Sequence, residues 1–129
     1  MFVVVDTHAL AWWLEGNPKL SATACAALEG CQRPLLVPVL VAAELLHMGK
    51  KRGDPARMRA LFAGLRESDD LLILPLTEHE LSLLSPELDL HDAIIVASAL
   101  AYAARSGEAV TVLTKDERIA GCGLVETAW

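Results

Sequence analysis

The chain has 129 residues, the length of one compact domain, and its net charge of −6 at pH 7 argues against a uniformly basic nucleic-acid binder. Hydrophobic residues make up 53%, but no apolar run reaches the roughly 20 residues that span a bilayer, and the start of the chain lacks the basic region of a signal peptide. The three cysteines form no C-x-x-C pair, which argues against a disulfide framework or a structural zinc site and predicts a protein of the reducing cytoplasm.

The first half of the chain predicts two strands and four helices. The strands are short β-branched or leucine-rich runs, typical of buried strands, at residues 3–5 and 35–37. The helices are expected at residues 9–14, 21–29, 40–51 and 55–66. Ser21 is a favoured N-cap for the second helix, and Asp54 followed by Pro55 is a start signal for the fourth.

The second half continues the alternation. Strands are expected at residues 71–74 and 110–113, with a last short strand at residues 124–125. Thr77 and Glu80 form a capping box for a short helix. Further helices are expected at residues 90–104, closed by Ser106 and Gly107, and at residues 116–120. Because the apolar runs are continuous rather than alternating, the pattern predicts an α/β domain over residues 1–129, with a parallel sheet of four to five strands flanked by helices on both faces.

Four acidic residues stand out against this framework. Asp6 directly follows the first strand and Asp116 follows the fourth, so both are aimed at the edge where the strands of a parallel sheet end and where α/β proteins bind ligands. Asp92 begins a long apolar helix, and Glu44 lies inside another. Structural alternatives stay open, because Asp92 and Asp116 could be helix N-caps and Glu44 could face solvent. An unpaired charge at the buried strand end of Asp6 is harder to explain structurally.

The chemistry of such a cluster follows from charge. Carboxylates packed side by side repel one another unless one is protonated or a cation is present. Mg²⁺ and Mn²⁺ prefer oxygen ligands, lower the pKa of a bound water and stabilise charge on a phosphodiester. An acidic cluster without a set of His or Cys ligands therefore predicts phosphoryl chemistry rather than a zinc site.

Four short segments extend this pattern. They are residues 4–10 (VVDTHAL), 42–45 (AAEL), 89–99 (DLHDAIIVASA) and 113–116 (LTKD). In their order and spacing, and in the length of the chain, they resemble PIN domains of the VapC toxin type over essentially the full length of the sequence.

This resemblance implies a metal-dependent endoribonuclease that cleaves single-stranded RNA by a metal-activated water, with Mg²⁺ or Mn²⁺ as its cofactor. It makes Asp6 and Asp92 the principal metal ligands. Glu44 and Asp116 complete the catalytic pocket and hold a metal directly or through water. Thr114 supports the pocket by hydrogen bonding.

The third segment departs from the family pattern. Many relatives carry Asp-Pro at the positions of Asp89 and Leu90, and Arg at the position of Ala93. Asp92 is unaffected, whereas Asp89 is expected to have a rim or capping role because an exposed Asp is usually solvated. His8 and His91 lie next to proposed ligands, and we expect local packing for both.

The resemblance also implies partners. One is a small, VapB-like antitoxin that sends an Arg-bearing segment towards the acids, where a guanidinium would be attracted. Homodimerisation is typical of the resembled family, and a membrane is not an expected partner. Six of the eleven cations lie in one stretch and are candidates for RNA contact: Lys50, Lys51, Arg52, Arg57, Arg59 and Arg66. A merely solvated helix face is the alternative for this stretch.

Two other functions remain open at this point. An aspartate-based phosphatase or a receiver-like module also places an Asp at a strand end, but a second Asp two residues later is missing because His8 stands there. A non-catalytic binding module of the same fold is the other alternative. Four mutually repelling acids argue against it.

Overall fold

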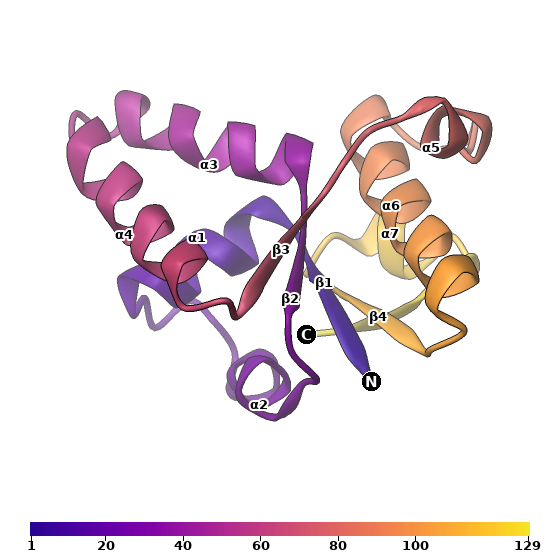
Figure 1. Cartoon of the computed structure of the whole chain (residues 1–129), viewed down its shortest axis with the longest axis horizontal. Coiled ribbons are helices and arrows are strands. Elements are labelled where there is room, and N and C mark those ends of the chain that lie inside the picture. Colours follow the sequence, from indigo (N-terminus) through magenta and orange to yellow (C-terminus); the bar gives the residue numbers. More distant parts are fainter.

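A computed structural model describes residues 1–129. Its centre is a five-stranded sheet with the strand order β3-β2-β1-β4-β5, and every neighbouring pair is parallel (Figure 1). The strands are β1 (Phe2–Val5), β2 (Leu35–Pro38), β3 (Leu71–Leu74), β4 (Val110–Leu113) and β5 (Glu126–Ala128). The predicted α/β fold with a parallel sheet is confirmed.

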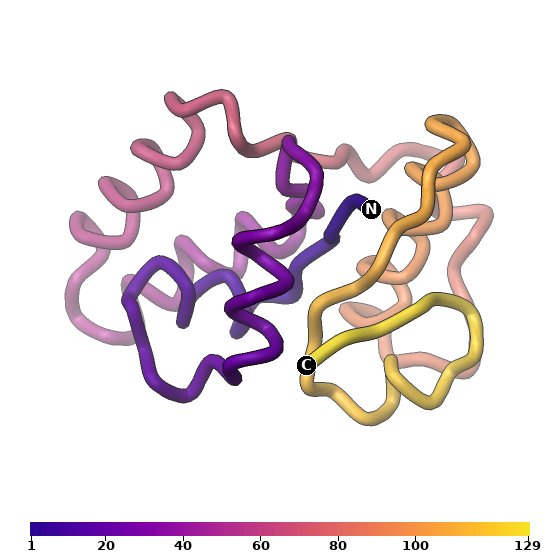
Figure 2. Tube along the Cα trace, turned by 90° about the horizontal axis from the view of Figure 1, so that it is seen from below, coloured from indigo at the N-terminus to yellow at the C-terminus, as the bar shows by residue number.

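The prediction for the last strand was wrong by two residues. The strand at the C-terminal end is β5, and it runs beside β4 in Figure 2, with Thr111 opposite Glu126 and Leu113 opposite Ala128. The predicted pair Leu124-Val125 precedes it, and Leu124 is 46% exposed. An edge strand is defined by its backbone pairing and does not need apolar side chains. The prediction relied on the apolar pair and therefore placed the strand two residues too early.

Seven helices connect the strands. They are α1 (Thr7–Glu15), α2 (Ala22–Gly30), α3 (Val39–Lys51), α4 (Pro55–Glu67), α5 (Glu78–Ser82), α6 (Leu90–Ser106) and α7 (Glu117–Ala120). Ser21 and Asp54 cap α2 and α4, and Gly107 ends α6 in the left-handed conformation, as the sequence predicts. No helix of the chain unites the length with the apolar character that crossing a bilayer requires.

The helices lie in two groups with the strands between them. In Figure 1, α1, α3 and α4 lie to one side and α5, α6 and α7 to the other. Helix α6 packs on β2 and β4, and α3 and α4 pack on β3. This covering explains why residues 3–5 and 35–37 are fully buried and form continuous apolar runs.

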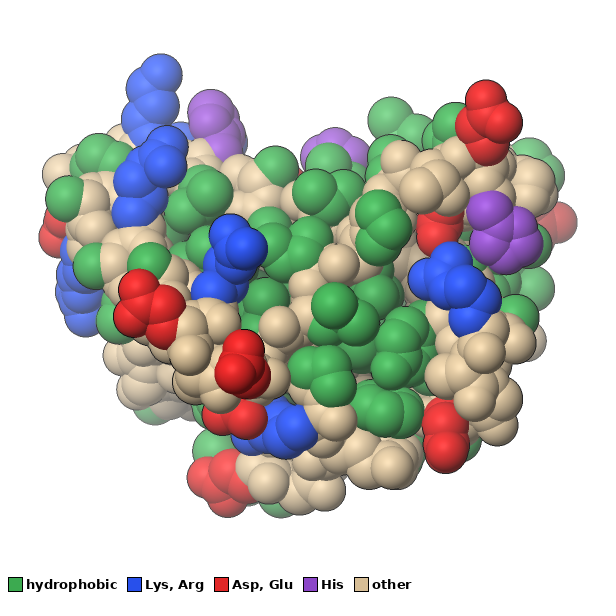
Figure 3. Space-filling view, in the orientation of Figure 1, with side chains coloured by type: hydrophobic (Ala, Val, Ile, Leu, Met, Phe, Trp, Pro, Cys, Tyr) green, Lys and Arg blue, Asp and Glu red, His purple; other side chains and the backbone are tan.

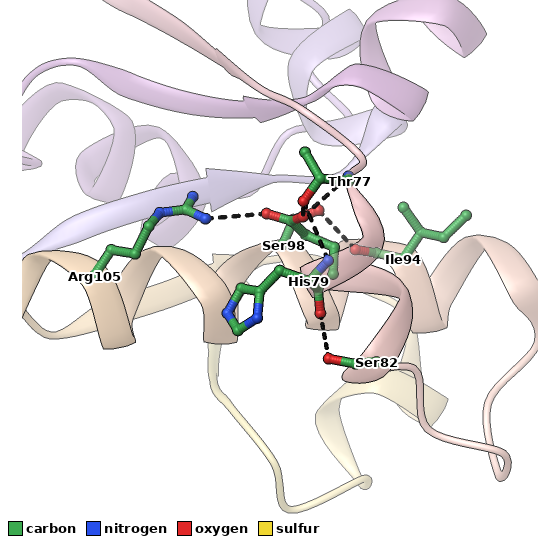
Figure 4. Close-up of polar contacts among 7 residues, drawn as sticks. Thr77, His79, Ser82, Ile94, Ser98 and Arg105 are labelled. Atoms are coloured by element: carbon green, nitrogen blue, oxygen red, sulfur yellow. Dashed lines mark hydrogen bonds and ion pairs between the residues drawn. The ribbon is translucent and has the colours of Figure 1, made fainter.

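A partly buried ion pair connects α5 to α6. Glu80 is almost fully buried, and its carboxylate accepts hydrogen bonds from the hydroxyl and backbone N–H of Thr77 in the predicted capping box. The guanidinium of Arg105, on α6, donates to Glu80 Oε1 at 3.1 Å (Figure 4). These bonds anchor α5 to the helix that carries Asp92.

Candidate active site

Asp6 lies at the carboxyl end of β1, where it also caps α1. Its Oδ1 accepts the backbone N–H of Ala9 at 2.9 Å, and its Oδ2 accepts a hydrogen bond from the hydroxyl of Thr114. Burial raises the pKa of this carboxyl, and the negative charge of Asp116 adds to the rise. The two hydrogen bonds and His8 act in the opposite sense. Asp6 is thus a buried acid close to a second carboxylate.

Asp116 lies beside Asp6 at the end of β4. It is the N-cap of α7, so the capping alternative is confirmed: its Oδ1 accepts the backbone N–H of Arg118 at 2.8 Å. Its own backbone N–H donates to Oγ1 of Thr114 at 3.0 Å. Thr114 therefore bridges Asp6 and Asp116 through a single hydroxyl.

Asp92 lies in the first turn of α6 and is not its N-cap. Asp89 takes that position, but its side chain makes no capping hydrogen bond. Burial raises the pKa of Asp92, and the charge of Asp116 raises it further, whereas Arg118 and His91 lower it. The pKa values of Asp6 and Asp92 are therefore raised by the same two causes, which are burial away from water and the negative charge of Asp116.

Glu44 approaches from α3, on the other side of the strands. Its Oε1 is buried and has no hydrogen-bond partner, although Nδ1 of His91 lies 3.4 Å away. Glu44 also lines a cavity of about 330 Å³ with Thr7 and His8, the residues that follow Asp6. The solvent-facing alternative for Glu44 therefore holds for only part of the side chain. A buried oxygen without a donor is costly.

His8 and His91 flank this cluster. The ring of His8 packs against Trp12, with 5.5 Å between the ring centroids, as expected for a packing role. His91 is exposed, and its neighbour across the pocket is Glu44. Three of the four predicted site residues, Asp6, Asp92 and Asp116, therefore lie close together where β1 and β4 end, and Glu44 reaches this cluster only through His91, which neighbours Asp92.

Sequence reasoning missed Arg118. Its Nη1 lies 2.5 Å from Oδ2 of Asp89, and its Nε lies 3.5 Å from Oδ1 of Asp116 and 4.0 Å from Oδ2 of Asp92. Asp116 is the main reason why the pKa of this guanidinium is raised. Its position two residues after Asp116 was the only signal in the sequence, and it does not reveal the direction of the side chain.

The donor set fits a hard divalent cation. Its members are carboxylates, which Mg²⁺ and Mn²⁺ prefer, and the orphaned Oε1 of Glu44 lacks the kind of partner that a cation would supply. The side chains are not arranged as a finished ion site, because no three Asp, Glu, His or Cys residues surround one point. Asp6 is turned to Thr114, while Asp92 and Asp116 are turned to Arg118.

The basic stretch lies next to this pocket. All six of its Lys and Arg side chains are exposed, and they gather over α3 and α4, on the left of Figure 3. Lys51 and Arg52 line the cavity that contains Glu44. Arg52 also pairs with Glu15, so part of its charge is neutralised within the chain.

The family model of the PIN domain matches residues 3–122. The chain belongs to the PIN-domain family. Proteins of this family are generally nucleases, which supports nuclease activity for this PIN domain and agrees with its acidic pocket. No curated protein sequence gives a significant match to the chain.

Solved structures resemble this PIN domain over nearly its whole length. One is a toxin–antitoxin complex from Klebsiella pneumoniae, with 22% identity, a TM-score of 0.68 and 98% of both chains covered. Another is VapBC2 from Rickettsia felis bound to a DNA fragment from its promoter, with 12% identity, a TM-score of 0.68, and 99% of this chain and 98% of the other covered. At such identities the likeness establishes the fold.

Proposed function

We propose that this PIN domain is a Mg²⁺- or Mn²⁺-dependent endoribonuclease that cleaves single-stranded RNA. The observation that carries the proposal is the close approach of Asp6 and Asp92 to Asp116, together with a buried Glu44 oxygen that has no donor. Asp6 and Asp92 would be the principal ligands, and Glu44 and Asp116 would complete the pocket. A divalent ion bound there would lower the pKa of a water and offset the charge of a phosphodiester.

The other groups of the pocket have supporting roles. Thr114 orients Asp6 and anchors the backbone of Asp116, so it ties the end of β1 to the segment that follows β4. Lys51 and Arg52 lie in the cavity next to Glu44, where they would attract the phosphates of an RNA strand. The strand would then cross from the basic face of α3 and α4 into the acidic pocket.

We also propose that the chain is the toxin of a toxin–antitoxin pair and acts in the cytoplasm. The support is the full-length likeness to the Klebsiella toxin–antitoxin complex and to VapBC2. A small, VapB-like antitoxin would cover the pocket, and its Arg side chains would be attracted to the acids. Homodimerisation belongs to the same proposal.

The deciding experiment is cleavage of a labelled single-stranded RNA with Mn²⁺, using folded chain free of antitoxin. Wild type should cut, Asp92→Asn should not, and a chelator should stop cutting until Mn²⁺ or Mg²⁺ is restored. Asp69→Asn is the matched control, because Asp69 is exposed in the turn before β3 at a φ of 57°, which Asn tolerates. Cleavage that survives chelation, or that Asp92→Asn retains in full, would contradict the proposed site.

The toxin proposal has its own test. Expression of the chain alone should slow growth of a bacterial host, and co-expression of the cognate antitoxin should restore it. Harmless expression at high level, with intact cellular RNA, would remove the toxin proposal while leaving the nuclease proposal in place.

The alternative functions lose support. Membership of the PIN-domain family argues against an aspartate-based phosphatase or a receiver-like module. A non-catalytic binding module would have no physical reason to hold a buried Asp6 and a half-buried Asp92 next to Asp116. Absence of cleavage on a broad panel of RNAs would favour that module.

A further inference from the structure

One guanidinium contacts three acids that come from two segments of the chain. Arg118 contacts Asp89 at the start of α6, Asp92 within its first turn, and Asp116 at the end of β4. No other Lys or Arg forms an ion pair with an acid of the pocket. Arg118 is therefore the only fixed positive charge in contact with the cluster.

These contacts use oxygens that a divalent ion would need. The Nε of Arg118 faces Oδ2 of Asp92 and Oδ1 of Asp116, two of the four proposed ligands. A guanidinium cannot lose its charge in a protein, so it offsets the mutual repulsion of the acids at every pH where they ionise. Two cations close to the same oxygens repel each other, and therefore the guanidinium and an ion exclude each other there.

The arrangement also leaves Arg118 room to withdraw. Its side chain is 65% exposed, and Asp89, its shortest contact, is 72% exposed at the rim of the pocket. The two inner contacts are long, 4.0 Å to Asp92 and 3.5 Å to Asp116, and the guanidinium itself is exposed, so breaking them costs little. The contact with Asp89 can hold the guanidinium at the rim when the two inner contacts are broken.

We propose that Arg118 is a positioning residue that acts as the built-in counter-ion of the metal pocket. In the ion-free protein it holds Asp92 and Asp116. When a divalent ion binds, Arg118 releases these two acids and stays at the rim of the pocket in contact with Asp89. This inference rests on the proposed function, since it assumes that Asp92 and Asp116 are ligands. Arg118 would therefore lower the affinity of the pocket for the ion, and it would stabilise the folded pocket when no ion is bound.

The test is the affinity for Mn²⁺, measured by calorimetry on the antitoxin-free chain without RNA. Arg118→Gln should bind Mn²⁺ about three- to tenfold more tightly than wild type, the range expected when a partly exposed competing charge is removed. Arg118→Lys should stay near wild type, because it keeps the competing charge. Arg33→Gln, at an exposed position outside the basic stretch, removes the same charge elsewhere and should leave the affinity unchanged.

Thermal unfolding supplies a second readout. Without an ion, Arg118→Gln should have a lower Tm than wild type, since the acids then repel without a counter-ion. Saturating Mn²⁺ should raise its Tm by more than it raises that of wild type, because binding to the folded state is tighter. A merely structural role would lower the Tm with and without the ion by the same amount.

The role of Asp89 is tested by a double-mutant cycle. Asp89→Asn should weaken Mn²⁺ binding in wild type, because Arg118 is no longer held at the rim and stays on the ligands. The same substitution should weaken binding less in the Arg118→Gln background, where only the removal of a negative charge still acts. Equal effects in both backgrounds would show that Asp89 does not hold Arg118.

The outcomes separate the two proposals. Suppose that wild type binds Mn²⁺ and that Asp92→Asn does not. If Arg118→Gln then binds Mn²⁺ no more tightly than wild type, the counter-ion role is overturned and the metal site stands. Binding that Asp92→Asn retains in full would overturn the metal site, and the counter-ion proposal with it.

Discussion

Thr114 donates a hydrogen bond to Asp6, although 108 positions separate the two residues in the chain. The register of the sheet explains this hydrogen bond, because Val5 lies opposite Leu113 and the next residue of each strand is a member of the pair. The same Thr114 oxygen accepts the backbone N–H of Asp116 at 3.0 Å. One hydroxyl thus ties together the ends of β1 and β4 and the two acids that follow them.

Thr114→Val should impair both the fold and the pocket. The substitution keeps the shape but leaves Oδ2 of Asp6 without a donor and the N–H of Asp116 without an acceptor, which should cost about 1–3 kcal/mol of unfolding free energy. Because that hydrogen bond lowers the pKa of Asp6, its removal should raise the pKa further. Mn²⁺ affinity should fall about 10- to 100-fold, as for other outer-shell partners of metal ligands. Thr114→Ser keeps the hydroxyl and should stay near wild type in calorimetry and in chemical denaturation.

Asp6→Asn should abolish cleavage without destabilising the ion-free fold. The folded pKa of Asp6 lies above the ordinary value of 3.8, so the folded state holds the proton more tightly than the unfolded state. The unfolding free energy of the ion-free protein therefore falls as the pH rises from 3.8 through the raised pKa of Asp6. At pH 7 a neutral Asn at this position avoids that fall. Asn also remains a favoured N-cap for α1. A Tm well below that of wild type at pH 7 would contradict this reasoning.

Glu80 should make the fold sensitive to strong acid. The hydrogen bond from Thr77 is the largest cause that lowers its pKa from 4.5 to about 2, and the ion pair with Arg105 also contributes (Figure 4). The contribution of ionised Glu80 to the unfolding free energy is complete above pH 4.5 and is lost as the pH falls towards about 2. Glu80→Gln should lower the unfolding free energy at pH 7 by about 2 kcal/mol and flatten its fall between these pH values. Glu87→Gln, at an exposed position, is the control for Tm measurements across this range.

The basic face of α3 should contribute to RNA binding through charge. Replacing Lys50, Lys51 and Arg52 by Gln should weaken binding of single-stranded RNA and reduce its salt dependence by about 0.7 in logarithmic slope for each phosphate that the protein no longer neutralises. Arg52 already pairs with Glu15, so the two lysines should account for most of the change. The measurement is RNA binding against salt concentration in the inactive Asp6→Asn background. An unchanged slope would mean that these cations are only solvated surface.

The sequence alone predicts most of the fold because the decisive signals are local. Continuous apolar runs indicate buried strands, and Ser21, Asp54, the Thr77–Glu80 capping box and Gly107 mark helix ends within a few residues. The strand β5 escaped this reasoning because an edge strand is defined by its backbone partner β4, which lies in another part of the sequence. Its side chains need not be apolar.

For the pocket, the sequence by itself determined which acids the chain has and that two of them follow strands. Because parallel strands end at the same side of the sheet, this placed Asp6 and Asp116 on that side. Only the tertiary structure decided where the side chains point. It leaves an oxygen of Glu44 buried without a donor, and it places Arg118 among acids up to 29 positions away. The physical reason is that side-chain direction depends on how α3, α6 and α7 pack around the sheet, and this packing couples residues that no local pattern connects.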